Sequence, residues 1–297
     1  NIKGTKHRYG AVFEDDKFSP ATGASTASKL INVDKVNVIV SFGSPVGNVV
    51  SPIAEQNKIV HLNGIASDQN VAKGDYNFVH WTPPYEESRL LISELKKKNF
   101  GRVGVFVTNQ PGTIAVANQV KTDLTKNSIA LADYEVFNGG EKDFRSYIGK
   151  MKATNPEILI VIATSPELEV LVQQIKDLGI KTPLTSIEAF EFSEKLSLFE
   201  GSWYVNAADP TDEFTAMYKK AYGSNPTLGA ANGYDIVNLI VKAVEKEGTE
   251  SYAIKAALYE TQDYPGAVGS LSVDKDGLVL SKAVVRMIKD GKPLTIK

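Results

Sequence analysis

The sequence predicts an α/β protein of two domains with parallel sheets, on three observations. Short runs rich in β-branched residues alternate with amphipathic helical patterns, which is typical of βαβ units. The chain has 297 residues, more than one hydrophobic core usually organises. After residue 205 the alternation gives way to one helical pattern after another, which indicates that the chain returns to a domain begun earlier.

Eight strands are expected up to residue 187, each a short apolar run that stops at polar or turn-forming residues. They are residues 8–13, 36–42, 59–62, 78–81, 102–107, 134–137, 157–163 and 184–187. Between them, Phe144, Ile148 and Met151 share one helical face, and Val116 and Val120 lie on another one-sided stripe. Both stripes are expected to pack on a sheet.

The last third is expected to hold helices and then β structure. The helical patterns cover residues 213–222, 230–247 and 252–259. Asp276-Gly277 between residues 271–273 and 278–280 is a strong hairpin signal, because Gly readily adopts the turn's positive φ.

Proline pairs indicate where the chain crosses between the domains. Pro83-Pro84 and Asp209-Pro210 interrupt regular structure at the two expected crossings. We therefore expect residues 1–82 with 208–270 to form one domain, and residues 83–207 with 271–297 to form the other.

Composition excludes several classes of protein. Hydrophobic residues make up 42% and charged residues 23%, which is typical of globular proteins, and the net charge of -2 gives no field that would attract nucleic acid. With no cysteine, disulfides, thiolate catalysis and Cys-ligated zinc are excluded. The three histidines are not paired at helical spacing, and no glycine-rich dinucleotide motif occurs, so no metal and no cofactor are expected.

Two strand ends of opposite polarity predict the ligand site. Glu188 follows the strand at 184–187, and Ser44 follows the strand at 36–42 in the loop Phe42-Gly43-Ser44. Ligands of open α/β sheets bind at the carboxyl ends of strands, so Glu188 could bind an ammonium group and Ser44 a carboxylate. The alternatives are that Glu188 is an acid favoured at a helix N-terminus and that Ser44 is a helix cap.

Several segments in a fixed order give the chain a family resemblance. They are NIKGTK at residues 1–6, SPIAEQ at 51–56, GEKDF at 140–144, GYD at 233–235 and GSLSVDKDG at 269–277. Together they resemble the type I periplasmic binding proteins, specifically the branched-chain amino acid receptors of bacterial ABC importers. The resemblance covers essentially the whole chain.

The resemblance implies two Rossmann-like lobes that are joined by three crossovers and close over a ligand. It implies that Ser44 and Ser67 bind the ligand carboxylate, that the Ile65 carbonyl accepts an ammonium proton, and that Glu188 binds the ammonium. Ser67 lies in a polar loop where hydroxyl groups are common, which is the alternative for that residue.

Five further residues are candidates for lining the site. Phe42 and Phe190 flank the polar anchors, with packing in the core as the alternative, and Gly43 belongs to the serine loop. Pro111 and Thr164 stand where the family often has aromatic residues.

The sequence also departs from the family pattern at its start. It begins after the family's first strand and helix, so we expect the first sheet to lack that strand. It shows no charged segment followed by an apolar one, so any export signal is expected to have been removed or never to have existed.

These patterns predict a non-enzymatic solute-binding protein that captures an amino acid or similar small zwitterion for the membrane permease of an ABC importer. The resemblance implies a periplasmic or extracellular location, with a lipid anchor as one form, and a monomeric full-length protein. The alternative is a binding protein, sensor or regulator for a small carboxylate that lacks the amine. An enzyme is disfavoured because no nucleophile and base are visible together.

Overall fold

The computed structural model describes residues 4–296, which fall into two compact units. Unit 1 comprises the described residues up to Pro83 together with Asp209–Ser281. Unit 2 comprises Pro84–Ala208 together with the described residues from Lys282 onward. The chain thus passes three times from one unit to the other, and each unit is described by itself below.

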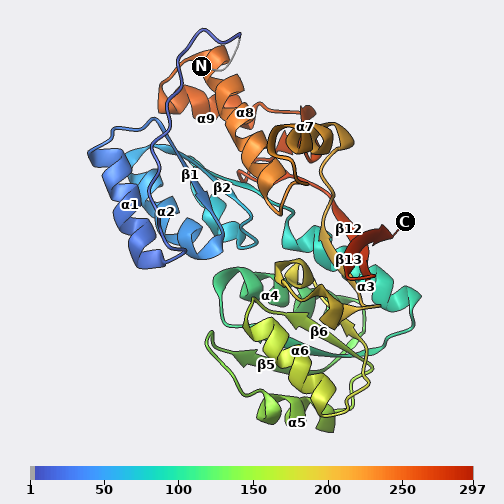
Figure 1. Ribbon diagram of the computed structural model, residues 1–297. Coiled ribbons are helices and arrows are strands. Elements are labelled where there is room, and N and C mark those ends of the chain that lie inside the picture. Colours follow the sequence, from blue (N-terminus) through green and yellow to red (C-terminus); the bar gives the residue numbers. More distant parts are fainter. Residues whose placement is uncertain (1–3, 297) are drawn as a thin grey trace. The chain divides into compact units, whose positions relative to one another are not determined.

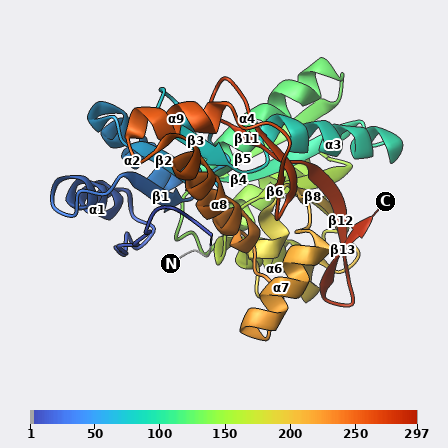
Figure 2. The same cartoon turned by 90° about the horizontal axis from the view of Figure 1, so that it is seen from above.

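Unit 1 is built on a parallel sheet in the order β1-β2-β3. Its elements are α1 (Pro20–Asn32), β1 (Val38–Phe42), α2 (Ser44–Asn57), β2 (Val60–Gly64), β3 (Asn77–His80), α7 (Asp212–Tyr222), α8 (Ala230–Glu247), α9 (Ser251–Tyr259), β9 (Tyr264–Gly266), β10 (Gly269–Val273) and β11 (Val279–Leu280), with a 3-10 turn at Gln69–Ala72. Helices α1 and α2 cover one side of the sheet, and α8 and α9 cover the other (Figures 1 and 2).

Unit 2 contains a parallel sheet in the order β5-β4-β6-β7 and an antiparallel sheet in the order β13-β12-β8. Its elements are α3 (Pro84–Lys97), β4 (Arg102–Thr108), α4 (Pro111–Lys126), β5 (Ala130–Phe137), α5 (Arg145–Ala153), β6 (Ile158–Ile162), α6 (Glu167–Asp177), β7 (Leu184–Thr185), 3-10 turns at Ala189–Phe192 and Leu196–Phe199, β8 (Trp203–Ala207), β12 (Ala283–Lys289) and β13 (Lys292–Ile296). A bridge between Ile187 and Val205 links the two sheets.

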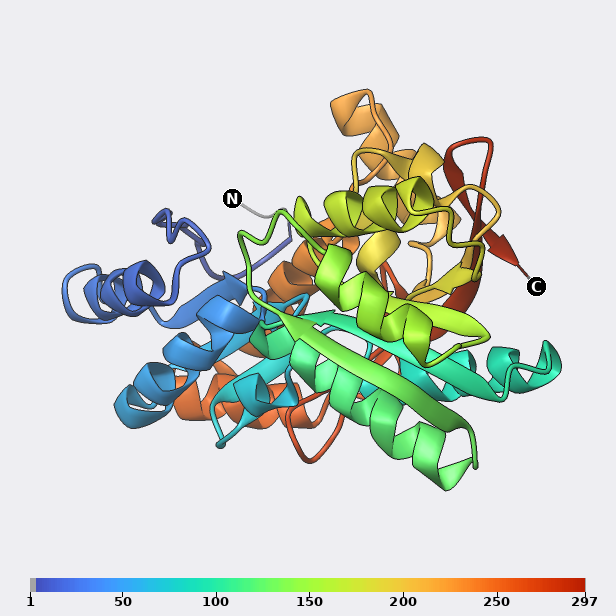
Figure 3. The same cartoon turned by 90° about the horizontal axis from the view of Figure 1, so that it is seen from below.

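Two apolar cores hold unit 2 together, one on each face of its parallel sheet. Helices α3 and α4 pack on one face, and α5 and α6 pack on the other. Figure 3 shows α5 and α6 in yellow-green on one side of the sheet and α4 in green on the other. The helical stripes expected at Ile148 and Met151 and at Val116 and Val120 are buried in these cores, which confirms that they pack on a sheet.

The strand expected at residues 8–13 is wrong. The segment has no strand assignment, and Phe13 is 88% exposed. Among the described residues, β1 pairs only with β2, so the other edge of β1 has no neighbouring strand. Residues 8–13 therefore do not join the sheet, and an apolar run without a neighbour does not form a strand. The first three residues of the NIKGTK motif lie outside the described residues.

The third crossing also differs from the expectation. Residues 271–281 belong to unit 1, although the sequence placed them in the other domain. The hairpin of β10 and β11 is present as predicted, but β10 pairs with β9, and Leu278 bridges to Val79 of β3. These bonds, together with the burial of Leu271 in the core of unit 1, hold the hairpin on that unit.

No helix within residues 4–296 is long and apolar enough to span a membrane. Over the same residues, no cluster of three or more His, Asp and Glu side chains could hold a metal ion.

Gly277 is the tightest backbone position of the hairpin, and its substitution should destabilise unit 1. Its φ is +78°, and a Cβ there would lie 2.5 Å from the carbonyl oxygen of Asn77. Gly277→Ala should therefore cost about 2 kcal/mol or more in the free energy of unfolding, measured by urea denaturation. Gly223 is a matched control with φ +74° and open space around it, so Gly223→Ala should cost only about 1 kcal/mol. Equal losses would show that the contact with Asn77 is unimportant.

Candidate functional site

In unit 2 the parallel register brings three predicted site residues to one edge of the sheet. Pro111 begins α4 after β4, Thr164 follows β6, and Glu188 follows β7. Because β4, β6 and β7 are neighbours with aligned registers, these residues leave the sheet at its carboxyl edge. Pro111 is exposed, and Thr164 is half-buried with its hydroxyl 3.4 Å from Gln110 Nε2. This edge is where ligands of open α/β sheets bind.

Glu188 has an unusual backbone conformation at this edge. Its φ is +62° and its ψ is -44°, which a residue with a Cβ adopts only when its surroundings enforce it. Its amide donates to the Val205 carbonyl at 2.8 Å, which holds it beside β8. The side chain is half-buried and makes no capping bond to the 3-10 turn that follows. Glu188 is thus the N-cap residue of this 3-10 turn, without a capping bond from its side chain.

A buried ion pair fixes the loop that carries Glu188. Arg286 of β12 donates to both carboxylate oxygens of Glu191 at 2.7 and 2.8 Å. Glu191 Oε1 also accepts from Tyr204 and Asn206 of β8, and Arg286 donates to the Ala207 carbonyl. Both bonds to Glu191 come from Arg286 Nη1, and together with the bonds from Tyr204 and Asn206 they anchor the turn three residues after Glu188 to the antiparallel sheet.

Glu87 is a second acid beside Glu188, and the sequence analysis missed it. It lies in the first turn of α3 and is 0% exposed. Within the described part of the chain, neither of its carboxyl oxygens has a hydrogen bond of ordinary distance and angle, and the same is true of the hydroxyl of Ser88. Burial raises the pKa of Glu87 well above its ordinary range, and the charge and hydrogen-bonding contact of Glu188 raise it further. The surroundings of Glu87 therefore favour its protonated form.

The sequence contained a signal for Glu87. The buried face of α3 includes Glu87, Leu91 and Leu95 at successive intervals of four residues. An acid in an apolar stripe is unusual, because burying a charge without a partner costs several kcal/mol. This position could therefore have been predicted to be buried and protonated.

In unit 1 the carboxyl ends of β1 and β2 bring together the other predicted polar residues. Ser44 is the first residue of α2, after Gly43 with φ +76°, and is 4% exposed. Its hydroxyl accepts from the Asp68 amide at 3.1 Å, which ties the start of α2 to the loop after β2. Helix N-terminal amides and a hydroxyl at one place suit an anion such as a carboxylate.

Ile65, Ser67 and Phe42 lie at the same edge of unit 1. Phe42 pairs in register with Gly64, and Gly43 donates to the Gly64 carbonyl, so the two strand ends are adjacent. Ile65 has φ +55°, and Ser67 is buried. Phe42 is 41% exposed and its ring lies over Gly64, so the structure leaves it available as an apolar surface at this edge.

The prediction that Phe190 lines the ligand site is wrong. It is 0% exposed and stacks on Phe199 with a centroid distance of 4.3 Å, with Tyr204 at 5.4 Å. It belongs to the core between the sheet and α6, so it does not line the predicted site. The alternative of core packing holds for Phe190 because the 3-10 turn after Glu188 directs its ring inward.

A hydrogen-bond chain in unit 1 has the order of a hydrolytic triad but not its accessibility. Ser41 Oγ lies 2.7 Å from His61 Nε2, and His61 Nδ1 lies 3.0 Å from Asn77 Oδ1. Burial lowers the pKa of His61 to about 4, so the imidazole is neutral. Ser41 is only 6% exposed and Asn63 also donates to its hydroxyl. This arrangement stabilises polar groups inside unit 1 and offers no open nucleophile.

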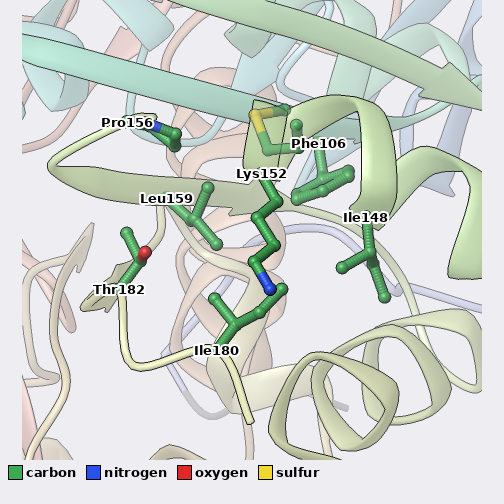
Figure 4. Close-up of a pocket in the computed structure, with 8 residues that line it drawn as sticks. Phe106, Ile148, Lys152, Pro156, Leu159, Ile180 and Thr182 are labelled. Carbon is green, nitrogen blue, oxygen red and sulfur yellow. The ribbon is translucent and has the colours of Figure 1, made fainter. Parts of the chain in front are cut away.

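The voids within unit 2 do not coincide with the strand-end residues. Figure 4 shows a void of about 10 Å³ beside Phe106, Pro156 and Thr182, room for no more than one water molecule. Pro156 and Thr182 precede β6 and β7, so this void lies at the amino edge of the sheet. A groove of about 510 Å³ runs between α3 and α4, away from Thr164 and Glu188.

Two α/β units with parallel sheets, joined by three crossings and bearing polar groups at their strand ends, define the class of two-domain binding proteins. The family model described as periplasmic binding protein matches residues 2–292. The chain therefore belongs to the periplasmic binding protein family.

Similar proteins include a relative known by sequence and two solved structures. The Leu/Ile/Val-binding protein homolog 3 of Brucella melitensis is 23% identical over 292 residues, covering 93% of this chain and 78% of that protein. A leucine-binding protein of Thermotoga maritima has a TM-score of 0.88 and 22% identity, covering 95% of this chain and 85% of that one. A solute-binding protein of an ABC transporter from Rhodopseudomonas palustris, in complex with 3,4-dihydroxybenzoic acid, has a TM-score of 0.83 and 19% identity, covering 97% and 84%. Because both solved structures are less than 25% identical to this chain, the comparison with them shows that the fold is shared and nothing more.

The buried acid Glu87 should make the stability of the protein fall as the pH rises. Its pKa in the folded protein is raised above that of an unfolded glutamic acid, about 4.3. Above that pH the unfolded chain loses a proton that the folded protein keeps, so the free energy of unfolding decreases by up to about 1.4 kcal/mol per pH unit until the folded pKa is reached. Glu87→Gln should remove this loss and gain stability relative to the wild type as the pH rises.

Denaturation at a series of pH values measures the effect, and the neighbouring residue provides the control. Glu86 pairs with Arg89 on the surface at 2.8 Å, so Glu86→Gln should change the free energy of unfolding by less than about 1 kcal/mol and leave its pH dependence intact. A constant difference between Glu87→Gln and the wild type at every pH would contradict the protonated state of Glu87.

Proposed function

We propose that this protein captures an amino acid or similar small zwitterion and delivers it to the membrane permease of an ABC importer. The observation that carries the proposal is Glu188, a half-buried acid held at the carboxyl edge of a parallel sheet in a strained backbone conformation. An acid placed in this way suits a cationic group of a ligand. The names of the Brucella and Thermotoga relatives support a branched-chain amino acid as the ligand class.

In this proposal each predicted site residue has a defined role. Ser44, the adjoining amides of α2 and Ser67 bind the ligand carboxylate, and the Ile65 carbonyl and Glu188 bind the ammonium. Phe42 and Gly43 in unit 1, and Pro111 and Thr164 in unit 2, line the side-chain region. Since Pro111 and Thr164 are not aromatic, aliphatic side chains meet a less bulky boundary there.

The location and the absence of catalysis follow from the same proposal. Members of a family of periplasmic binding proteins act outside the cytoplasm, and attachment by a lipid anchor is one form in which this protein meets its permease. Binding and release require no covalent step, and the protein acts on its ligand as a receptor rather than an enzyme.

A second candidate ligand class is a small carboxylate without an amine. The Rhodopseudomonas relative was solved with 3,4-dihydroxybenzoic acid, which has a carboxylate and no ammonium. The groups around Ser44 would serve such a ligand equally well, whereas Glu188 would have no cationic partner.

A ligand screen distinguishes the two classes. Leucine, isoleucine and valine should raise the melting temperature, because a ligand at one hundred times its Kd stabilises the folded state by about 2.7 kcal/mol. The corresponding deaminated acids and benzoates should have smaller effects at equal concentration. The reverse order would support the carboxylate class, and no shift with any of them would contradict both.

Substitutions at Glu188 and Ser44 test the assigned roles. Glu188→Gln should cost about 1.5–3 kcal/mol of affinity for the amino acid, because the neutral amide loses a charge-assisted hydrogen bond, and should spare the deaminated acid. Ser44→Ala should weaken both ligands alike, since both contain the carboxylate. Isothermal titration calorimetry of the four combinations measures the difference. If Glu188→Gln weakens both ligands equally, Glu188 does not bind the ammonium.

A further inference from the structure

A chain of buried polar side chains in unit 1 leads to an inference about how the ligand carboxylate is bound, which rests on the proposed function. The chain comprises Asn77, His61, Ser41 and Asn63, which come from three neighbouring strands and are all buried. They lie on the face of the sheet that α2 covers, since Asn77 and His61 both contact Ser51 of that helix. Polar groups buried in such number call for a physical reason.

The direction of this hydrogen-bond chain is fixed at its first end by oxygen atoms around Asn77. The acceptors that Asn77 Nδ2 meets are the Lys73 carbonyl at 2.9 Å, the Ser51 carbonyl at 3.2 Å and the Glu55 carboxylate at 3.2 Å. Asn77 Oδ1 is therefore the atom that accepts from His61 Nδ1, at 3.0 Å. Burial lowers the pKa of His61, so the imidazole is neutral, its one hydrogen lies on Nδ1, and Nε2 is an acceptor.

The chain continues in the same direction to the loop that carries Ser44. Ser41 Oγ lies 2.7 Å from His61 Nε2 and donates its hydrogen there, because Nε2 has none. Ser41 Oγ in turn accepts from Asn63 Nδ2, also at 2.7 Å. The second hydrogen of Asn63 Nδ2 goes to the Gly43 carbonyl at 3.2 Å. Every hydrogen of the chain is thus placed, and the chain ends on the residue before Ser44.

The Gly43 carbonyl sets the orientation of the Asn63 amide, although that orientation has a cost. Asn63 Oδ1 is buried and has no hydrogen-bond partner among residues 4–296. Turning the amide over would bring Oδ1 against the Gly43 carbonyl oxygen, and two acceptors repel each other. A Cβ on Gly47 would lie 2.8 Å from Asn63 Nδ2, so the amide lies directly against the first turn of α2.

The Gly43 carbonyl matters to a ligand because it shares a peptide plane with the Ser44 amide. This peptide is trans, so its C=O and N–H point in opposite directions, and bonds that hold the carbonyl also aim the amide. The first amides of a helix have no intrahelical partner, and Pro45 has no N–H, so those of Ser44 and Val46 suit a carboxylate. The Ser44 hydroxyl accepts from the Asp68 amide and can donate its own hydrogen to the same ligand group.

We propose that Asn63 is a positioning residue for the ligand carboxylate. Through the Gly43 carbonyl it holds the amide and the hydroxyl of Ser44 in their binding orientation, and the hydrogen-bond chain through Ser41 and His61 holds Asn63 in turn. Asn63 itself does not contact the ligand.

Asn63→Leu separates positioning from stability. The leucine side chain has nearly the shape of asparagine, and the change removes the bond to Gly43 together with the unpartnered Oδ1, so the melting temperature should change little. The affinity for isoleucine and for its deaminated acid should fall by about fivefold or more, because both ligands contain the carboxylate. Thermal denaturation and isothermal titration calorimetry measure the two effects.

Asn238→Leu is the matched control, because it makes the same chemical change at another asparagine of unit 1. Asn238 Nδ2 donates to the Tyr234 carbonyl within α8 at 2.8 Å. This variant should bind both ligands as the wild type does. An equal loss of affinity in Asn238→Leu would show that any such change disturbs binding, which overturns the positioning role.

A double-mutant cycle tests whether Asn63 acts through Ser44. In a Ser44→Ala background Asn63→Leu should weaken binding less than it does in the wild type, because the hydroxyl that it misplaces is already absent. Fully additive losses would overturn the inference. Ser41→Ala is a milder second variant if Asn63→Leu does not fold. It removes the acceptor that orients Asn63 and should weaken both ligands in the same direction.

Nitrogen NMR spectroscopy of the His61 ring tests the direction of the chain without any ligand. At neutral pH the wild-type protein should have a hydrogen on Nδ1 and none on Nε2. A hydrogen on Nε2 would reverse the bond to Ser41 and overturn the inference. If Asn63→Leu binds isoleucine as tightly as the wild type does, the positioning role fails and the proposed function stands. If neither ligand binds to the wild type, both fail together.

Discussion

The parallel alignment of strands decides where every candidate residue of this protein lies. In a parallel sheet the strands run in the same direction, so all carboxyl ends meet at one edge and the helices that follow begin there. In unit 2 this places Pro111, Thr164 and Glu188 in one row, and in unit 1 it places Ser44 beside Ile65. The residues that fill the cores can vary without disturbing this edge, whereas a shift of register would scatter it.

The second constraint is the electrostatics of two acids of unit 2, Glu191, which is paired with a cation, and Glu87, which is fully buried. Arg286 neutralises Glu191 and thereby fixes the turn after Glu188, whereas within residues 4–296 the carboxyl oxygens of Glu87 have no hydrogen bond of ordinary geometry. Unit 2 therefore contains one acid paired for rigidity and one whose pKa is raised by burial.

Much of the fold could be predicted from local patterns, because short apolar runs and helical stripes mark elements whose burial is local in origin. Residues 8–13 show the limit of this reasoning: their pattern suits a strand, but a strand needs a neighbour, and that information is not local. The sequence also placed the hairpin of β10 and β11 in the wrong domain for the same reason. Its pairing with β9 and its contact with β3, neither of which is a local pattern, decide to which domain it belongs. At the site, Glu188 could be placed from its strand end, but Phe190 could not be distinguished from core aromatics, and Glu87 required recognising an acid within an apolar stripe.

The division of the chain also has a consequence for the order in which the protein forms during synthesis. Unit 2 takes most of its residues from a continuous stretch, Pro84–Ala208, which interrupts the sequence of unit 1. The face of the first sheet that bears Leu62 and Phe78 is covered by Leu239 and Ile254, which are made more than a hundred residues later. At ribosomal rates this apolar face stays uncovered for about ten seconds or more. The first sheet to be made is thus completed late, and chaperone protection of the growing chain matters most in that interval.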